Sequence, residues 1–274
     1  MAVTSLASLK AAISRSQRFC LLPVSTTVLT GGVTMTTSFV ATVFGTLATP
    51  AVAGSGGTSY SQSGSGNGYP AWNAAPAGQV SYIHRGINQY AIGGTGILYD
   101  LLWGCSGFVT NTTTSAQTVS STTLPSRNGS AVNAANEMWL FVGTTIGVTQ
   151  TNVQISYTNQ SGTAGRTATA TLAASAAASR IYPCLLQSGD TGVQSVQSVT
   201  FQTLTGTDGA VSLLLMNRIA HLPGSPAVNY LAVSDFASSG LPQVADQAVI
   251  LPVFLPYSSS GTSGPGCAFE IIQG

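Results

Sequence analysis

Side chains that could perform acid–base or nucleophilic chemistry are few and widely separated in this chain. A glycosidase needs two carboxylates around one bond, and a Ser–His–acid relay needs a histidine between its partners. The acids are Asp100, Glu137, Asp190, Asp208, Asp235, Asp246 and Glu270. No nucleophile elbow, phosphate-binding loop or metalloprotease motif accompanies them. We therefore expect no enzymatic activity and no catalytic residues.

The local context of these groups favours structural roles. Asp190 and Asp208 stand beside glycines, which predicts turns in which Asp bonds to its own backbone. His221 lies in an apolar stretch and is expected to be a satisfied structural histidine. His84, next to Arg85, is expected at the surface or in an interface.

The sequence gives no sign of a metal or cofactor site. The four cysteines form no C-x-x-C pair and lie far from both histidines, so a zinc site is not expected. Each cysteine has apolar neighbours, which favours buried free thiols over disulfides. The glycine-dense stretch 93–96 lacks a following G-K-[ST] and is typical of a tight turn.

Charge is unusually scarce, and this limits the kinds of surface that the protein can have. Charged residues make up 5% of the chain, hydrophobic residues 44%, and the formal net charge is +1. The chain can therefore bury a core, while its surface must consist mainly of Ser, Thr, Asn, Gln and Gly. Low net charge promotes association, so we expect a protein covered by copies of itself or by partners. An unusually uncharged secreted β protein is the alternative.

Charge and apolar content along the chain argue against two classes of partner, nucleic acids and membranes. The first 99 residues contain four basic side chains and no acid, which is too sparse for a nucleic-acid footprint. The apolar-leaning stretch 35–52 contains many Ser, Thr and Gly residues and one proline. A membrane span needs about 20 mainly apolar residues. We expect neither specific nucleic-acid binding, nor a membrane span, nor a signal peptide.

Composition divides the chain into an N-terminal arm, a linker and a body. Residues 4–19 are predicted to form an amphipathic helix capped by Thr4 or Ser5, with Arg15 and Arg18 in its last turns. The arm spans 1–53, and a Gly/Ser linker spans 54–68. The body, 69–274, could consist of two packed sub-domains near 69–145 and 146–274. The candidate interface residues are apolar or basic: Leu6, Leu9, Lys10, Ile13, Arg15, Arg18, Arg85, Arg127 and Arg166.

The body has the patterning of a mainly β protein. Residues 153–157 and 168–172 alternate apolar and small or polar types around a turn-rich stretch, which predicts a hairpin. Residues 196–201 predict another strand, and 267–271 alternate again. The apolar run 249–255 is interrupted by Pro252, which indicates a core strand with a bulge or an edge. Together these elements predict a β-sandwich or jelly-roll-like body with a helix-containing arm.

Several runs, in this order, resemble a family of tailed-phage and prophage virion proteins. Residues 98–103, LYDLLW, are similar to that family's LYDRLW stretch, although the family more often has Arg at the fourth position of the stretch, where this chain has Leu. A Thr/Ser tract with Gln117 and then LPSR (124–127) follows, as in the family. Residues 155–167 resemble its SYTNxxGTAGRT hairpin, and 186–200 resemble its LQxGDTGVxSVQSVT segment. The closing 272–274 is similar too, so the resemblance spans roughly 69–274.

The resemblance implies a structural virion protein. We expect a decoration or cement protein on the exterior of the phage head, made in the host cytoplasm and bound to the major capsid protein or other virion proteins. By analogy with the head lattice, a homo-oligomer, specifically a trimer, is expected. A tail, collar or baseplate adaptor is the alternative. A depolymerase using Asp100 or Glu137, or a carbohydrate-binding protein with Trp72, Trp103 or Trp139 as platforms, is less favoured.

Overall fold

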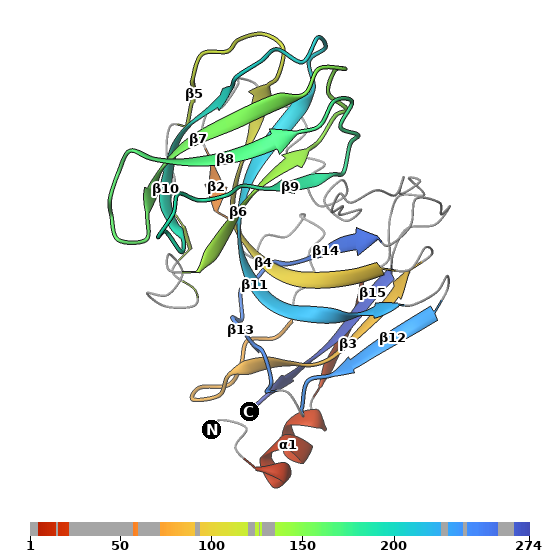
Figure 1. Cartoon of the computed structure of the whole chain (residues 1–274). Coiled ribbons are helices and arrows are strands. Elements are labelled where there is room, and N and C mark those ends of the chain that lie inside the picture. Colours follow the sequence, from red (N-terminus) through yellow and green to blue (C-terminus); the bar gives the residue numbers. More distant parts are fainter. Residues whose placement is uncertain are drawn as a thin grey trace. The chain divides into compact units, whose positions relative to one another are not determined.

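The chain is mainly β, with one short helix at its N-terminal end (Figure 1). The computed structural model describes residues 5–14, 16–21, 57–59, 72–90, 94–119, 124–125, 127, 135–225, 230–237, 240–256 and 266–274. Most of the expected linker, 54–68, and residues 22–53 of the arm lie outside these ranges.

The described elements begin with α1 (Leu6–Ile13). The strands are β1 (Gln17–Leu21), β2 (Thr58–Ser59), β3 (Ser81–Tyr90), β4 (Gly94–Val109), β5 (Gln117–Thr118), β6 (Asn136–Val142), β7 (Thr151–Asn159), β8 (Arg166–Leu172), β9 (Ile181–Pro183), β10 (Val193–Phe201), β11 (Ala210–Ser225), β12 (Tyr230–Asp235), β13 (Gln243–Val244), β14 (Ile250–Pro256) and β15 (Gly266–Gln273). They form three sheets, ordered β1-β15-β3-β12, β5-β10-β7-β8 and β14-β4-β11-β6-β9; β13 also pairs with β3, and β2 with β4.

Helix α1 is shorter than the sequence predicts. Ser5 caps it as expected: its Oγ accepts from Ser8 N at 3.1 Å, and Ser8 Oγ accepts from Ser5 N at 3.0 Å. The helix ends at Ile13, and the prediction that it continues to residue 19 is wrong. Residues 17–21 instead form β1, because pairing with β15 gives their backbone ladder hydrogen bonds.

The chain divides into two compact units that are interleaved in the sequence. Unit 1 comprises 1–42, 62–100 and 219–274, and unit 2 comprises 43–61 and 101–218. A sequential division near residue 145 would cut through unit 2. Helix α1 and strand β1 both belong to unit 1.

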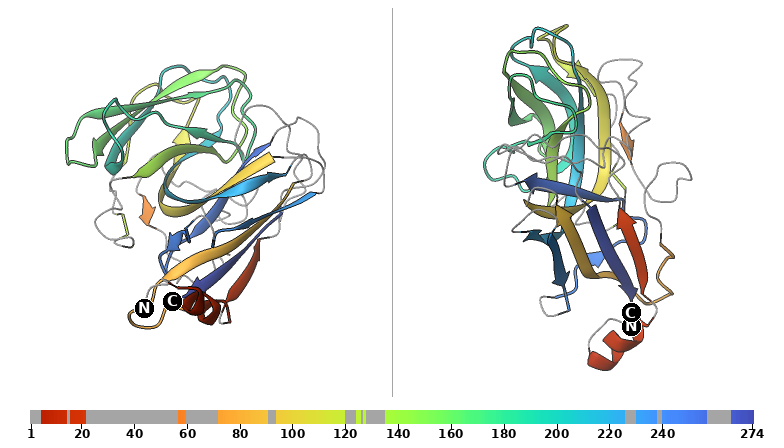
Figure 2. Two further views of the ribbon diagram at one scale, coloured as in Figure 1. Left: turned by 60° about the horizontal axis from the view of Figure 1, so that its bottom comes forward. Right: turned by 90° about the vertical axis from the view of Figure 1, so that its right-hand side faces the viewer.

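Unit 1 is organised around β15, which lies between β1 and β3 (Figure 2). Cys267, Phe269 and Ile271 of β15 are buried, as their alternation predicts. Strand β14 pairs with the first half of β4 at the edge of its sheet, which agrees with the expected effect of Pro252.

Unit 2 contains a β-sandwich core, as the sequence predicts. Its buried cluster joins Val153, Ile155 and Tyr157 of β7 to residues such as Leu140 of β6 and Leu213 of β11. Strand β7 alternates buried and more exposed residues along its whole length, and β8 continues this alternation across the predicted hairpin. The alternation fixes which side chains face solvent.

Two glycines, only four residues apart, test how tightly unit 2 is packed. A Cβ at Gly147 would overlap the backbone of Thr205 and Thr207, whereas a Cβ at Gly143 would lie 3.5 Å from its nearest atom, Ala210 O. We expect Gly147→Ala to lower the free energy of unfolding by about 1–3 kcal/mol through overpacking. Gly143→Ala, the matched control, should lower the free energy of unfolding by clearly less. Urea denaturation checks this, and equal effects would contradict the described packing.

Candidate functional site: an uncharged sheet face and the network behind it

The outer face of the sheet β5-β10-β7-β8 is made entirely of uncharged polar side chains. In β7 and β8 these residues alternate with core residues of unit 2, which places them on the opposite side of the sheet. In β10, whose register with β7 shifts twice, they are the exposed and half-buried residues between the buried ones. Thr118 is the exposed residue of β5. We call this surface the polar sheet face; its members are Thr118, Asn152, Gln154, Ser156, Thr158, Thr167, Thr169, Thr171, Gln194, Ser195, Gln197, Ser198 and Thr200.

Strand register arranges these side chains in rows across the sheet. Thr169 lies opposite Gln154, which lies opposite Thr200. A second row runs from Thr167 of β8 through β7 and β10 to β5. Neighbours hydrogen bond within the face: Thr171 Oγ1 donates to Asn152 Oδ1 at 2.9 Å. The rows therefore present hydroxyl and amide groups in positions fixed by the sheet.

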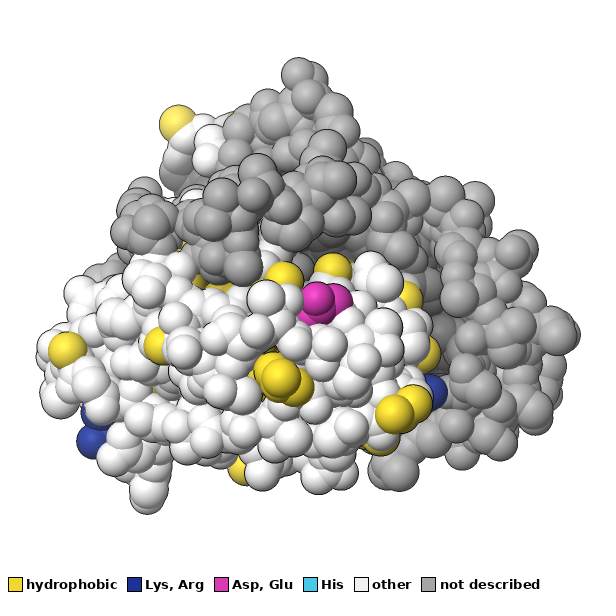
Figure 3. Space-filling view, turned by 90° about the horizontal axis from the view of Figure 1, so that it is seen from above, with side chains coloured by type: hydrophobic (Ala, Val, Ile, Leu, Met, Phe, Trp, Pro, Cys, Tyr) yellow, Lys and Arg dark blue, Asp and Glu magenta, His cyan; other side chains and the backbone are white. Residues whose placement is uncertain are grey.

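This face lacks the features that usually keep a β-sheet surface free in solution. Soluble proteins rely on interspersed charged side chains, and the polar sheet face has none. Its groups can both donate and accept hydrogen bonds, so they can match another uncharged polar surface. Among the atoms that Figure 3 colours by type in one view of the molecule, backbone and side chains that are neither hydrophobic nor charged predominate, and few charged groups are seen.

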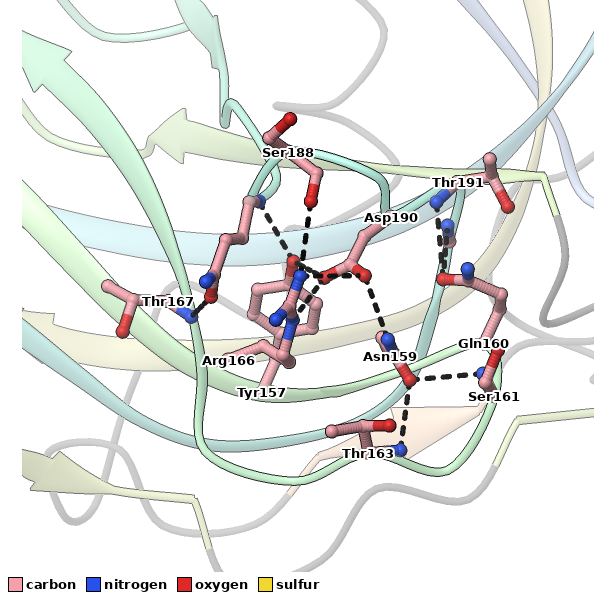
Figure 4. A network of polar contacts seen from close by, with 12 residues as sticks. Tyr157, Asn159, Gln160, Ser161, Thr163, Arg166, Thr167, Ser188, Asp190 and Thr191 are labelled. Carbon is pink, nitrogen blue, oxygen red and sulfur yellow. Dashed lines mark hydrogen bonds and ion pairs between the residues drawn. The ribbon is translucent and has the colours of Figure 1, made fainter.

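A polar network centred on Asp190 braces the hairpin β7–β8 that carries much of this face (Figure 4). Tyr157 donates its hydroxyl proton to Asp190 Oδ2 at 2.5 Å, and Asn159 Nδ2 donates to Oδ1 at 2.8 Å. Arg166 forms a bidentate pair with the same carboxylate, at 2.8 Å from Nε and 3.1 Å from Nη2. Gln187 N donates to the Tyr157 hydroxyl at 3.0 Å, which ties the loop before β10 to the hairpin.

The network shifts the proton affinities of its members. The pKa of Asp190 lies at about 2, below its ordinary value of 3.8, chiefly because Arg166 hydrogen bonds to the carboxylate. The pKa of Tyr157 is raised, first by burial and then by its hydrogen bond to Asp190. At neutral pH, therefore, the carboxylate is charged and the phenol remains protonated as the donor.

The side chains of Asp190 and Asp208, expected to bond to their own backbone in turns, have described partners in other segments. Asp190 reaches across to β7 and β8. Asp208 accepts from Asn111 N at 2.7 Å and from the Thr112 hydroxyl at 2.9 Å. Both carboxylates therefore join segments far apart in the sequence, which local turn patterns could not reveal.

A second ionisable cluster lies in unit 1, around His84. An irregularity in the β3–β15 register inserts His84 between the paired residues Ile83 and Arg85, and such bulges redirect side chains. His84 is buried, so its expected surface position is wrong. Its Nδ1 lies 3.3 Å from Glu270 Oε2, and its Nε2 lies 3.7 Å from Asp235 Oδ1. The imidazole thus links β3 to β15 and β12.

The candidate interface residues of α1 have different environments. Leu6 and Leu9 line a groove together with Tyr82 of β3 and Leu241. The remaining lining residues are Ser5, Ala237 and Gly240. Leu6 is exposed, whereas Leu9 is half-buried. Lys10 is exposed and Ile13 half-buried, and neither lines this groove.

The candidate arginines do not form one patch. Arg166 is committed to Asp190, and Arg127 donates to the backbone carbonyl of Leu101 at 2.6 Å. Arg85 lies 4.0 Å from Asp235. Arg18 falls on β1 opposite Glu270, but its side chain is outside the described ones, and Arg15 is also outside the described residues. The arginines with described contacts therefore serve contacts within the subunit.

The residues named for the carbohydrate and enzymatic alternatives are buried or engaged. Trp72, Trp103 and Trp139 are all buried, so none of them offers an open stacking platform. Asp100 is buried and accepts from Val249 N at 2.9 Å. Glu137 accepts from Arg218 Nη2 at 2.7 Å and from the Trp139 indole at 3.2 Å.

Metal-ligating residues do not gather anywhere in the described part of the chain: no group of three or more His, Cys, Asp or Glu side chains is placed to hold an ion. Cys105, Cys184 and Cys267 are buried free thiols, as expected for these three. Burial raises the pKa of Cys105 to about 12. Among the described helices, none is long and apolar enough to cross a bilayer.

Asp190 gives a pH prediction. Because its folded-state pKa is lowered, its stabilising contribution is present above the ordinary value of 3.8 and is lost as pH falls toward about 2. We expect the melting temperature of the wild type to fall more steeply between these values than that of Asp190→Asn. Arg166→Gln should reduce this dependence because it removes the main cause of the shift. Circular dichroism melts check this, and parallel curves for all three proteins would contradict it.

Comparison with known proteins identifies no relative. No protein-family model matches the chain, and neither the curated proteins nor the solved structures include a match. The sheet face and its supporting network must therefore be interpreted from their own chemistry.

Proposed function

We propose that this chain is a structural, non-catalytic component of a tailed-phage particle: a decoration or cement protein on the head exterior that binds across capsid subunits. The observation that carries the proposal is the polar sheet face, a whole sheet surface without an ionic group. Such a face suits permanent coverage by a neighbouring virion protein.

The physical reason lies in the cost of removing groups from water. Burying an ion in an interface carries a large desolvation penalty unless it is well paired. Hydroxyl and amide groups cost less to bury and recover hydrogen bonds from an equally uncharged partner. The described ion pair between Arg166 and Asp190 is satisfied within the subunit, so it makes no demand on a partner.

The sequence resemblance points in the same direction. Two of the runs that resemble phage virion proteins, 155–167 and 186–200, supply both sides of the Asp190 network. Residues of these runs also form much of the polar sheet face. A virion role thus gives the resembling residues a common purpose, which is to hold this face in shape.

Binding of this protein would stabilise the capsid shell by mass action. A protein that binds only the assembled shell shifts the equilibrium toward the assembled state. Exposed Lys10 and Leu6 of α1 supply a second contact region, with the basic and apolar character expected of the N-terminal segment.

Among the alternatives, a tail, collar or baseplate adaptor would use the same face. A carbohydrate-binding or depolymerising protein is less well supported, because the named tryptophans are buried and Asp100 and Glu137 have intramolecular partners. A density map of intact particles separates a head position from a tail position.

Charge placed on the polar sheet face tests the proposal. Thr169→Lys or Gln154→Lys would bury an unpaired ion in the interface, so we expect incorporation into particles to fall by about tenfold or more, equivalent to about 1.4 kcal/mol. Quantitative immunoblotting of purified virions measures this. Both positions are exposed, so the subunit should still fold.

The matched control is Ala77→Lys, which places the same charge on an exposed turn of unit 1. Its incorporation should equal that of the wild type. Undiminished incorporation of both face variants, with folding verified by circular dichroism, would reject the polar sheet face as the binding surface.

A further inference from the structure

Exposed sheet edges can pair with other chains, and most of the edges that the structure describes carry a protective feature. Strand β14 contains Pro252 and Pro256, and β1 has Arg18 at its second position. The edge of β8 is covered at Thr169, whose backbone N and O both hydrogen bond to the backbone of Leu185. Strands β5 and β9 are only two and three residues long.

Strand β12 is the exception among the described edges. It pairs with β3 in continuous register from Tyr230 to Asp235, without a bulge, and ends the strand order of its sheet. Residues 230–234 contain no charge and no proline. Leu231 and Val233 are 61% and 56% exposed, on the same side of the strand.

We propose that β12 pairs antiparallel with β12 of a second copy of this chain, joining two sheets edge to edge. A two-fold axis at Ala232 would place Leu231 opposite the partner subunit's Val233, and the symmetry repeats this apolar pair. Ala232 would face its own counterpart. The register thus pairs the two exposed apolar side chains with each other.

Charge favours a second copy as the occupant. The only ionic group of β12, Asp235, lies at its end and is within ion-pair distance of His84 and Arg85 of its own subunit. The proposed register therefore brings no carboxylates together. The formal net charge of +1 also leaves little long-range repulsion between copies. Identical strand edges close as a dimer, which differs from the trimer expected by analogy.

The oligomeric state tests this inference independently of any virion role. For the full chain, analytical ultracentrifugation over a dilution series should show a monomer–dimer equilibrium. Val233→Lys should weaken the dimer by about tenfold or more, because a charge on an edge strand opposes pairing. Val148→Lys is the matched control, since Val148 is 77% exposed but lies in a loop of unit 2. It should dimerise like the wild type.

Cross-linking tests the register. Ala232→Cys should form a disulfide-linked dimer under mild oxidation. The Cα atoms of residues directly opposite each other on antiparallel strands lie about 4.5–5.5 Å apart, and a disulfide spans this distance. Ser234→Cys, which would face the partner's Tyr230, should not. A monomeric wild type, a dimer unaffected by Val233→Lys, or cross-linking of Ser234→Cys in preference to Ala232→Cys would overturn the proposal.

Discussion

The bidentate pair between Arg166 and Asp190 is the constraint on which the candidate site depends. Its carboxylate also accepts from Tyr157 and Asn159, so one side chain fixes a hairpin and the loop leading to β10. The hydroxyl of Tyr157 belongs to a ring buried in the sandwich core. The interaction therefore connects the packing of unit 2 to the shape of its polar sheet face, and displacing it would disturb both.

A chain with so few ions uses them mainly for internal connections. Glu137 pairs with Arg218, His84 lies between two carboxylates, and Arg127 caps a strand carbonyl. Each of these contacts joins segments that are distant in the sequence. The polar sheet face is left to Thr, Ser, Asn and Gln. This division of roles explains how the fold can be specific while its exterior remains almost without charge.

Much of the fold could be predicted from the local alternation of residue types. Features that depend on pairing between strands far apart in the sequence could not. The Thr–Ala alternation of 167–171 identified β8, and the same pattern could have indicated an uncharged outer face. The helix end was misplaced because β1 forms only by pairing with β15, some 250 residues away. The burial of His84 depends on a bulge opposite β15. Both features require knowledge of the partner strand, which no local pattern contains.

The position of β15 has a consequence for synthesis. Strand β15 lies between β1 and β3, so the sheet of unit 1 lacks the strand that joins them until residues 266–273 are made. Until then the nascent chain holds unpaired edges on both sides of the gap, a state prone to misassembly. Unit 1 can therefore be completed only after residues 266–273 have left the ribosome, and termination before β15 would leave β1 and β3 without the strand that joins them.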